Sequence, residues 1–285
     1  MSHIFNRVSV LGGGLLGGSI VLALQDRTDT RLWFRKQEAA ENAHEQGIYQ
    51  ATGDLAEAVA NCDLLILAVP VGAMPPLLAA AVQAGLPGDC LVTDVGSVKQ
   101  APHQMLQAIL EESGNPFIGS HPMAGSEQNG LTAAHGQLFK GAACLLTNDS
   151  AASAEHCAAL EAFWESLGCR NTWFNAREHD ELVARISHLP HVVAAAGAKV
   201  SLKNPEIGGF GGGGLRDTTR VASGNPGMWA EILTENRSAI IPAIEETISE
   251  LREILATLQK PDQELTHQWL REAKQLRDTL HRNSI

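Results

Sequence analysis

Basic residues are scarce in this sequence, and their scarcity excludes one class of function. The 285 residues include 21 Lys and Arg against 32 Asp and Glu, which gives a formal net charge of -11. A protein that neutralises nucleic-acid phosphates needs a basic patch or stripe, and the sequence contains none. We therefore expect no nucleic-acid partner, and a solvated acidic surface accounts for the charge.

Paired cysteines, an N-terminal leader and a long unbroken apolar run are also missing. The five cysteines form no Cys-x-x-Cys pair, and their odd number fits reduced thiols in a cytoplasmic protein. The residues before the first strand lack the apolar core of a signal peptide. The most apolar run, residues 64–84, is interrupted by Pro70, Pro75 and Pro76, so it predicts a strand, a loop and a helix instead of a membrane span. We expect a cytoplasmic location and no membrane segment.

From residue 7 to about residue 175 the sequence alternates between strand-like and helix-like segments. A length of 285 residues is enough for two domains with their own cores, and a hydrophobic content of 44% is typical of a globular protein. The strands are expected at residues 7–11, 31–34, 64–69, 90–94, 117–120, 142–147 and 170–174. The alternation predicts an α/β fold for residues 1–175, with a Rossmann-type, mainly parallel sheet covered by helices on both faces.

After residue 176 the strand pattern stops, and residues 176–285 are expected to form an all-α domain. One long helix is predicted at 178–202, bent at Pro190, and another begins at Asn225. The second helix and the one after Pro261 each carry an apolar seam, made by Ile244, Ile248, Leu251, Leu255 and Leu258 and by Leu265, Trp269, Ala273, Leu276 and Leu280. Two such seams exceed the needs of one small core, so we expect a homodimer through this domain; an intramolecular bundle is the alternative.

A glycine-rich loop between the first strand and the first helix predicts a dinucleotide site. Gly12, Gly14 and Gly17 form the pattern G-x-G-x-x-G: the first permits a tight turn, the second lets the backbone approach a pyrophosphate, and the third allows close packing of helix on strand. Helix N-terminal amides then hold the phosphates. The remaining candidates for cofactor contact are Leu15 and Leu16 in this loop, and Val69 and Pro70 at the end of the strand at 64–69.

The end of the second strand indicates which nicotinamide cofactor is preferred. A site for NAD carries Asp or Glu there, to bond the ribose hydroxyls, whereas this strand ends in Arg35 and Lys36. Two cations suit a 2′-phosphate, so we predict a preference for NADP, with NAD also possible. The alternative is that both side chains are solvated and that the choice of cofactor is set elsewhere.

Three further segments should meet the cofactor at the carboxyl ends of the strands. They are residues 93–99 (Thr-Asp-Val-Gly-Ser-Val-Lys), residues 119–127 (Gly-Ser-His-Pro-Met-Ala-Gly-Ser-Glu), expected as a turn beyond a strand end, and two stretches of the helical half, 186–191 and 214–220. With the glycine loop, these segments resemble the prephenate/arogenate dehydrogenase family, and the resemblance extends in order from the first strand to about residue 240. It implies oxidative decarboxylation of a cyclohexadienol, prephenate or arogenate, to a phenol on the route to tyrosine, with hydride transfer to NAD(P)+.

The resemblance also implies roles for individual residues. His121 accepts the hydrogen bond of the substrate hydroxyl in its neutral form, and Ser97 orients His121 and that hydroxyl. Arg220 is the candidate for the ring carboxylate, because a guanidinium binds a carboxylate through two hydrogen bonds. The other substrate candidates are His191 for the side chain, Trp229 in the pocket wall, and Arg216, Ser126 and Glu127 at the rim. No metal ligand is expected, His188 is expected to be structural, and Lys99 could equally be a solvated residue at a helix start.

Several interpretations stay open at this point. Arogenate carries an ammonium where prephenate carries a keto group, so Glu127 would favour arogenate unless Arg216 or Arg220 neutralises it. A β-hydroxyacid-type dehydrogenase or an imine reductase also joins a Rossmann domain to a helical dimer domain, but would not need His121 in its turn. A nucleotide-sensing module without activity would leave Ser97, His121 and the substrate candidates without a purpose.

Overall fold

The computed structural model describes residues 4–25, 27–125, 130–260 and 262–281. The chain forms two compact units, Met1–Arg237 and Ser238–Ile285. In the part of the chain that is described, none of the helices combines the length and the apolar character that a membrane span needs.

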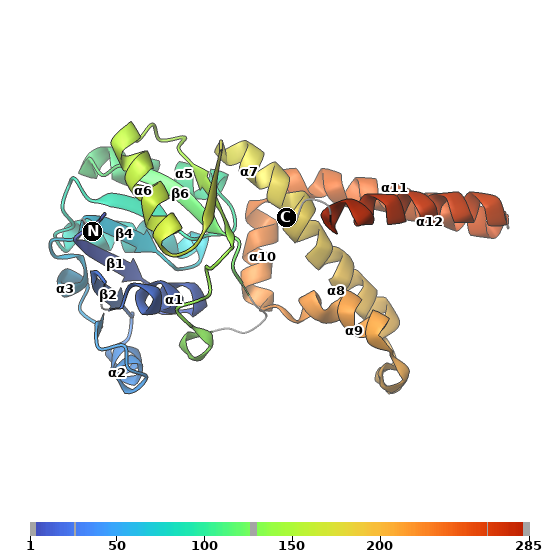
Figure 1. The fold of residues 1–285 in the computed structure, drawn as a ribbon, viewed down its shortest axis with the longest axis horizontal. Helices are drawn as coiled ribbons and strands as arrows, with labels where there is room; N and C mark the ends of the chain where they lie inside the picture. The colour runs from blue at the N-terminus through green and yellow to red at the C-terminus, as the bar shows by residue number, and fades with distance from the viewer. Residues whose placement is uncertain (1–3, 26, 126–129, 261, 282–285) are drawn as a thin grey trace. The chain divides into compact units, whose positions relative to one another are not determined.

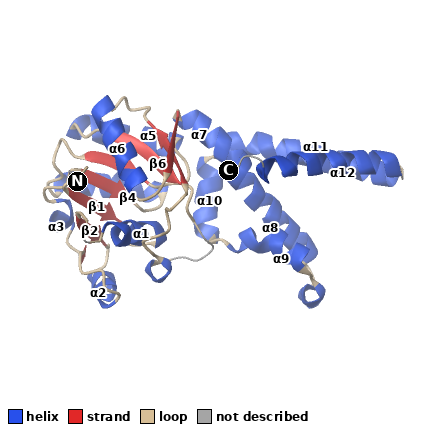
Figure 2. Cartoon of the chain, viewed as in Figure 1, coloured by secondary structure: helices blue, strands red, loops and turns tan. Residues whose placement is uncertain are grey.

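The first unit is organised by a sheet in the strand order β3-β2-β1-β4-β5-β6-β7-β8 (Figures 1 and 2). All neighbouring strands are parallel except β6 and β7, which are antiparallel. The strands are β1 (Arg7–Leu11), β2 (Asp29–Trp33), β3 (Ala51–Thr52), β4 (Leu64–Leu67), β5 (Leu91–Asp94), β6 (Phe117–Pro122), β7 (Ala143–Thr147) and β8 (Arg170–Phe174). The predicted mainly parallel Rossmann-type sheet is confirmed. The order of its strands reverses between β1 and β4, which is the place where such sheets bind ligands.

Helices cover both faces of this sheet because successive strand residues point to opposite sides. In β4, Leu64 and Ile66 join one core with the helices α1 (Leu15–Leu24), α2 (Gln37–Glu45) and α6 (Ala154–Ser166). Leu65 and Leu67 join the other core with α3 (Leu55–Val59), α4 (Met74–Gln83) and α5 (Gln100–Ser113). The continuous apolar run of β4 is therefore explained by burial on both sides.

The helices that follow the sheet continue in the first unit as far as α10. They are α7 (Ala176–Val183), α8 (Leu189–Ser201), α9 (Gly213–Thr219) and α10 (Pro226–Glu235), with short 3-10 segments at Pro205–Phe210 and Arg220–Ser223. The single bent helix predicted at 178–202 is instead two helices joined by a π-helical turn, Ala184–His188, in which the Leu189 amide donates to the Ala184 carbonyl. Pro190, which has no amide hydrogen, is the second residue of α8. The predicted domain boundary after residue 175 stays a prediction, since the compact unit extends to Arg237.

The described residues of the second unit form α11 (Arg237–Gln259, whose first residue ends the first unit), α12 (Gln263–Asp278) and a short 3-10 helix, Thr279–His281. The helix predicted from Asn225 onward is interrupted at Asn236, so α10 and α11 are separate. The indole Nε1 of Trp269 donates to Glu250 Oε2 at 3.2 Å and ties α12 to α11. Much of the predicted apolar seam is exposed in the single chain, at Ile248, Leu251, Leu255, Leu258, Leu265, Leu276 and Leu280.

Candidate active site

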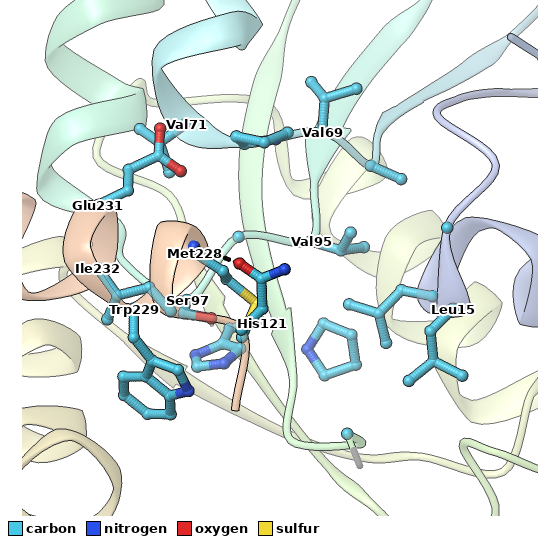
Figure 3. A pocket seen from close by; sticks show the side chains of 18 of the residues that line it. Leu15, Val69, Val71, Val95, Ser97, His121, Met228, Trp229, Glu231 and Ile232 are labelled. Atoms are coloured by element: carbon cyan, nitrogen blue, oxygen red, sulfur yellow. Dashed lines mark hydrogen bonds between the residues drawn. The ribbon is translucent and has the colours of Figure 1, made fainter. Parts of the chain in front are cut away.

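A cavity of about 810 Å³ lies at the carboxyl ends of β1, β4, β5 and β6 (Figure 3). Its volume suits a small organic ligand together with part of a cofactor. The segments that follow β1, β4 and β5 contribute residues 14–16, 68–71 and 95–97, and the end of β6 with the residues after it contributes 121–125. The helical half contributes Ser187 and His188 of the π turn and several residues of α10. The expected convergence therefore occurs for parts of residues 93–99, 119–127 and 186–191, whereas none of residues 214–220 lines this cavity.

The glycine loop has the shape that a pyrophosphate needs. A Cβ on Gly12, whose φ is +121°, would collide with the Ala68 carbonyl, and one on Gly17 would collide with the Gly12 carbonyl. A Cβ on Gly14, by contrast, would meet no heavy atom within 4 Å, and Gly14 lines the cavity. The N-terminus of α1 that follows has no side-chain cap, so its amides are available to an anion. These residues fit a dinucleotide.

The two cations expected to select NADP lie outside the cavity, directly after β2. Arg35 and Lys36 are exposed, and Lys36 is the N-cap residue of α2. The preceding residue, Phe34, packs its ring against Gly13, where a Cβ would overlap it. Because Phe34 contacts the glycine loop, its neighbour Arg35 lies near that loop. This is the end of the sheet at which an adenosine ribose is bound in this fold.

His121 is part of a hydrogen-bonded chain of three side chains. It lies inside β6 and not on a turn beyond the strand, because β6 continues past its pairing with β5 and pairs with β7, where His121 faces Leu145. Its Nδ1 is 2.9 Å from Nε2 of His179, and His179 Nδ1 is 2.8 Å from Oδ1 of Asp180. The Asp180 carboxylate also accepts the backbone amides of Lys99 and Gln100.

The hydrogen bonds that link His121, His179 and Asp180 determine which nitrogen of His121 carries the proton. Burial lowers the pKa of His121 well below its usual 6.5, and the neighbouring His179 and Lys99 lower it further. Burial also lowers the pKa of His179, although its bond to Asp180 opposes this. With both rings neutral, His179 donates from Nδ1 to the Asp180 carboxylate, so its Nε2 accepts from His121 Nδ1. His121 Nε2 is then left as a hydrogen-bond acceptor.

A buried ion pair shapes the loop that carries Ser97. Lys99 Nζ lies 2.5 Å from Asp94 Oδ2, and both side chains are fully buried. The Asp94 carboxylate also accepts the amides of Gly96 and Ser120, so it links the loop after β5 to β6. Ser97 and His121 both line the cavity. The alternative that Lys99 is solvated is therefore wrong: its side chain is fully buried and its ammonium is paired with the Asp94 carboxylate.

The predicted substrate residues fall into three groups. Trp229 lines the cavity, while His191 lies behind it, with its ring stacked on the indole at 3.6 Å between centroids and 9° between planes. Arg216 on α9 and Arg220 in the segment after it are exposed and do not line the cavity. Ser126 and Glu127 lie outside the described residues.

Sequence reasoning missed His179, Asp180 and Asn236, and it treated His188 as structural. His188 is fully buried, lines the cavity and accepts at Nδ1 from Asn236 Nδ2 at 3.0 Å; burial lowers its pKa to about 4. Asn236 Nδ2 also donates to the Asp180 carbonyl at 2.8 Å. Adjacent histidine and aspartate at 179–180 were the one available signal, but no local pattern shows that they face a strand 58 residues away.

The site combines a glycine loop for phosphates with a buried, neutral imidazole that has an acceptor nitrogen. This arrangement suits the oxidation of a hydroxyl group by a nicotinamide cofactor. The protein is a dehydrogenase of the nucleotide-binding class. The nucleotide-binding domain of prephenate dehydrogenase matches residues 23–172, and the dimerization domain of the same family matches residues 175–281. The chain belongs to the prephenate dehydrogenase family.

Individual relatives agree with this assignment. The cyclohexadienyl dehydrogenase of Zymomonas mobilis is 31% identical over 291 residues, which covers 96% of each chain. The prephenate dehydrogenase of Aquifex aeolicus, solved with hydroxyphenyl propionate and NAD+, has a TM-score of 0.88 at 27% identity, over 98% of this chain and 100% of that one. The arogenate dehydrogenase of Synechocystis has a TM-score of 0.79 at 28% identity, over 96% and 99% of the two chains.

Proposed function

We propose that the protein oxidises and decarboxylates prephenate in tyrosine biosynthesis. The hydrogen on the ring carbon that bears the hydroxyl departs as hydride, the hydroxyl proton passes to a base, and the ring carboxylate leaves as carbon dioxide as the ring becomes aromatic. A bound nicotinamide cofactor supplies the hydride acceptor. The observation that supports this proposal most strongly is that His121, with Nε2 left as an acceptor, lines the same cavity as the glycine loop.

In this proposal, residues in and behind the cavity have different roles. His121 Nε2 accepts the hydroxyl proton, and Ser97 orients the hydroxyl toward it. His179 and Asp180 are positioning residues, because they hold His121 in the tautomer that can accept. Since the base must be neutral and burial lowers the pKa of His121 below 6.5, its protonation should reduce the rate only below about pH 6.5.

The direct test is turnover by the purified protein. Prephenate and arogenate are each incubated with NADP and with NAD, and reduced-cofactor absorbance is followed together with carbon dioxide release. His121→Asn should lower kcat by roughly 10²–10⁴-fold while cofactor binding persists. Cofactor binding without turnover of either substrate would instead support the inactive nucleotide-sensing alternative.

NADP is the proposed preferred cofactor, and NAD an acceptable one. The support is the absence of a carboxylate after β2 and the presence of Arg35 and Lys36 at that place. Arg35→Ala should raise the KM for NADP and leave the KM for NAD unchanged. A tenfold preference of the wild-type protein for NAD would contradict the proposal.

The substrate carboxylates are proposed to meet Arg220 and Arg216, with His191 serving the side chain and Trp229 forming the wall. Arogenate stays the alternative substrate, because a carboxylate near the side chain would attract its ammonium. Glu127→Gln should then lower kcat/KM for arogenate selectively. An equal loss on both substrates would contradict that role, and so would an unchanged value for arogenate.

A homodimer through the helical half is proposed as the assembly, and a cytoplasmic location stays a prediction. The support is the match to a dimerization domain and the exposure of Leu251, 59%, and Leu255, 54%, on α11, which one chain alone leaves in water. The double variant Leu251→Glu, Leu255→Glu should shift the mass measured by light scattering from dimer to monomer. Arg252→Glu, on the same turns of α11, is the matched control and should stay dimeric.

A further inference from the structure

Glu231 makes a contact across the cavity that the proposed reaction does not use. It lies on α10, and its Oε1 accepts the backbone amide of Gly72 at 2.8 Å, across 159 residues of sequence. Figure 3 shows its carboxylate beside Val71 at the edge of the cavity. Both Glu231 and Val71 line the cavity.

The Gly72 amide needs an acceptor from elsewhere. Gly72 belongs to the 3-10 turn Val71–Ala73, which leads directly into α4, and the N-cap residue of that turn, Pro70, makes no side-chain cap. The first amides of a helical segment have no partner within it, and a carboxylate is the most favourable acceptor there. Glu231 therefore caps this helix start from a distant element.

The contact joins the two walls of the cavity. On one side, residues 68–71 border the glycine loop, and the Ala68 carbonyl packs against Gly12. On the other side, α10 supplies Met228, Trp229 and Ile232. Ile232 and Val71 also belong to the same core cluster, so both elements are anchored in one apolar core.

A role in attracting substrate does not explain this carboxylate. Among the described residues that line the cavity, Glu231 alone has a formally charged side chain at neutral pH, apart from the histidines. The proposed substrate is itself a dianion, which a carboxylate in the wall repels. The hydrogen bond to Gly72 therefore explains the position of the Glu231 carboxylate better than a contact with the substrate does.

We propose that Glu231 is a positioning residue that holds α10 at the loop after β4 and so sets the spacing between the cofactor wall and the substrate wall. The inference rests on the proposed function, because it assigns those walls to cofactor and substrate. Hydride transfer depends steeply on this spacing, since a displacement of about 1 Å in a reacting group can cost roughly 100-fold in rate.

Two substitutions separate the hydrogen bond from the charge. Glu231→Gln keeps an oxygen that can accept the Gly72 amide, whereas Glu231→Ala removes the acceptor. The matched control is Glu235→Ala, one turn further along α10 at a position that does not line the cavity. For each variant, the Kd of NADPH is measured by its fluorescence, kcat and KM by prephenate turnover, and Tm by thermal unfolding.

We expect Glu231→Ala to lower kcat and raise the NADPH Kd, each by about tenfold, with Glu231→Gln within about threefold of wild type because a neutral acceptor is weaker than a carboxylate. Glu235→Ala should match wild type. Equal damage from Gln and Ala would overturn the inference, and so would a loss confined to Tm. If the wild-type protein turns over neither substrate, the proposed function fails, while the NADPH Kd series still tests whether Glu231 holds the cofactor wall.

Discussion

Replacing His179 by Phe should impair the reaction by shifting the tautomer of His121, without touching the substrate. In the wild-type protein, His121 Nδ1 donates to His179 Nε2 at 2.9 Å. Phe offers no acceptor, and an unpaired buried donor costs roughly 1–3 kcal/mol. The proton then moves to Nε2, the nitrogen that must be free to accept in the proposed reaction. At 1.36 kcal/mol for each factor of ten, the accepting tautomer becomes roughly 5- to 150-fold less populated, and kcat/KM should fall by that factor.

The assay compares kcat/KM for His179→Phe, His179→Gln and wild type, with thermal unfolding recorded in parallel. Gln carries an oxygen that can accept from His121, so His179→Gln should recover part of the lost rate. The matched control is His103→Phe, at a buried histidine that bonds Ser150 and Thr147 and does not line the cavity. It should lower Tm and leave kcat/KM unchanged. If His179→Phe stays within twofold of wild type, or loses no more rate than the His103 control, the tautomer argument is refuted.

Three further predictions concern the loop, acid stability and the buried ion pair. Gly14→Ala should keep the wild-type Tm and weaken NADPH binding in a fluorescence titration, whereas Gly17→Ala should lower Tm, because only the second Cβ meets protein atoms. Acid should destabilise the protein below about pH 6.5, because His188, with a folded pKa of about 4, takes up a proton first in the unfolded chain. His188 alone should account for about 3 kcal/mol of the stability lost by pH 4, so urea titrations should show a loss smaller by about that amount in His188→Asn. Lys99→Met should cost about 3–5 kcal/mol by leaving Asp94 buried without its cation, and adding Asp94→Asn should recover part of that loss in chemical denaturation.

Much of the sheet was predictable because its signals are local. The bounds predicted for β1 and β8 are those observed, and the apolar run at β4 indicated burial on both faces. The strand β3 was not predicted, because its two residues are too few to show any periodicity. Their pairing with Leu32 and Trp33 depends on the tertiary structure. The end of β6 was placed too early because antiparallel pairing with β7, and not its own composition, extends it through His121.

The candidate site was predictable in its motifs but not in its hydrogen bonds. His121 and Ser97 were singled out from their segments, and both line the cavity. The bond from His121 to His179 joins a strand to a helix 58 residues later, and no spacing rule in the sequence specifies such a contact. Likewise, the break between α10 and α11 at Asn236 follows from a side chain turned inward to Asp180 and His188, which helical periodicity does not reveal.

The location of His121 within a strand, paired with Leu145 of β7, has a consequence for how the enzyme can diversify. The backbone amides of paired strands exchange with solvent only when the sheet unfolds. Hydrogen exchange at the amides of His121 and Leu145 should therefore be as slow as global unfolding. Loops that border the cavity can change length and composition while the imidazole keeps its coordinates. Substrate range can therefore drift within such a lineage without the proton acceptor having to be rebuilt.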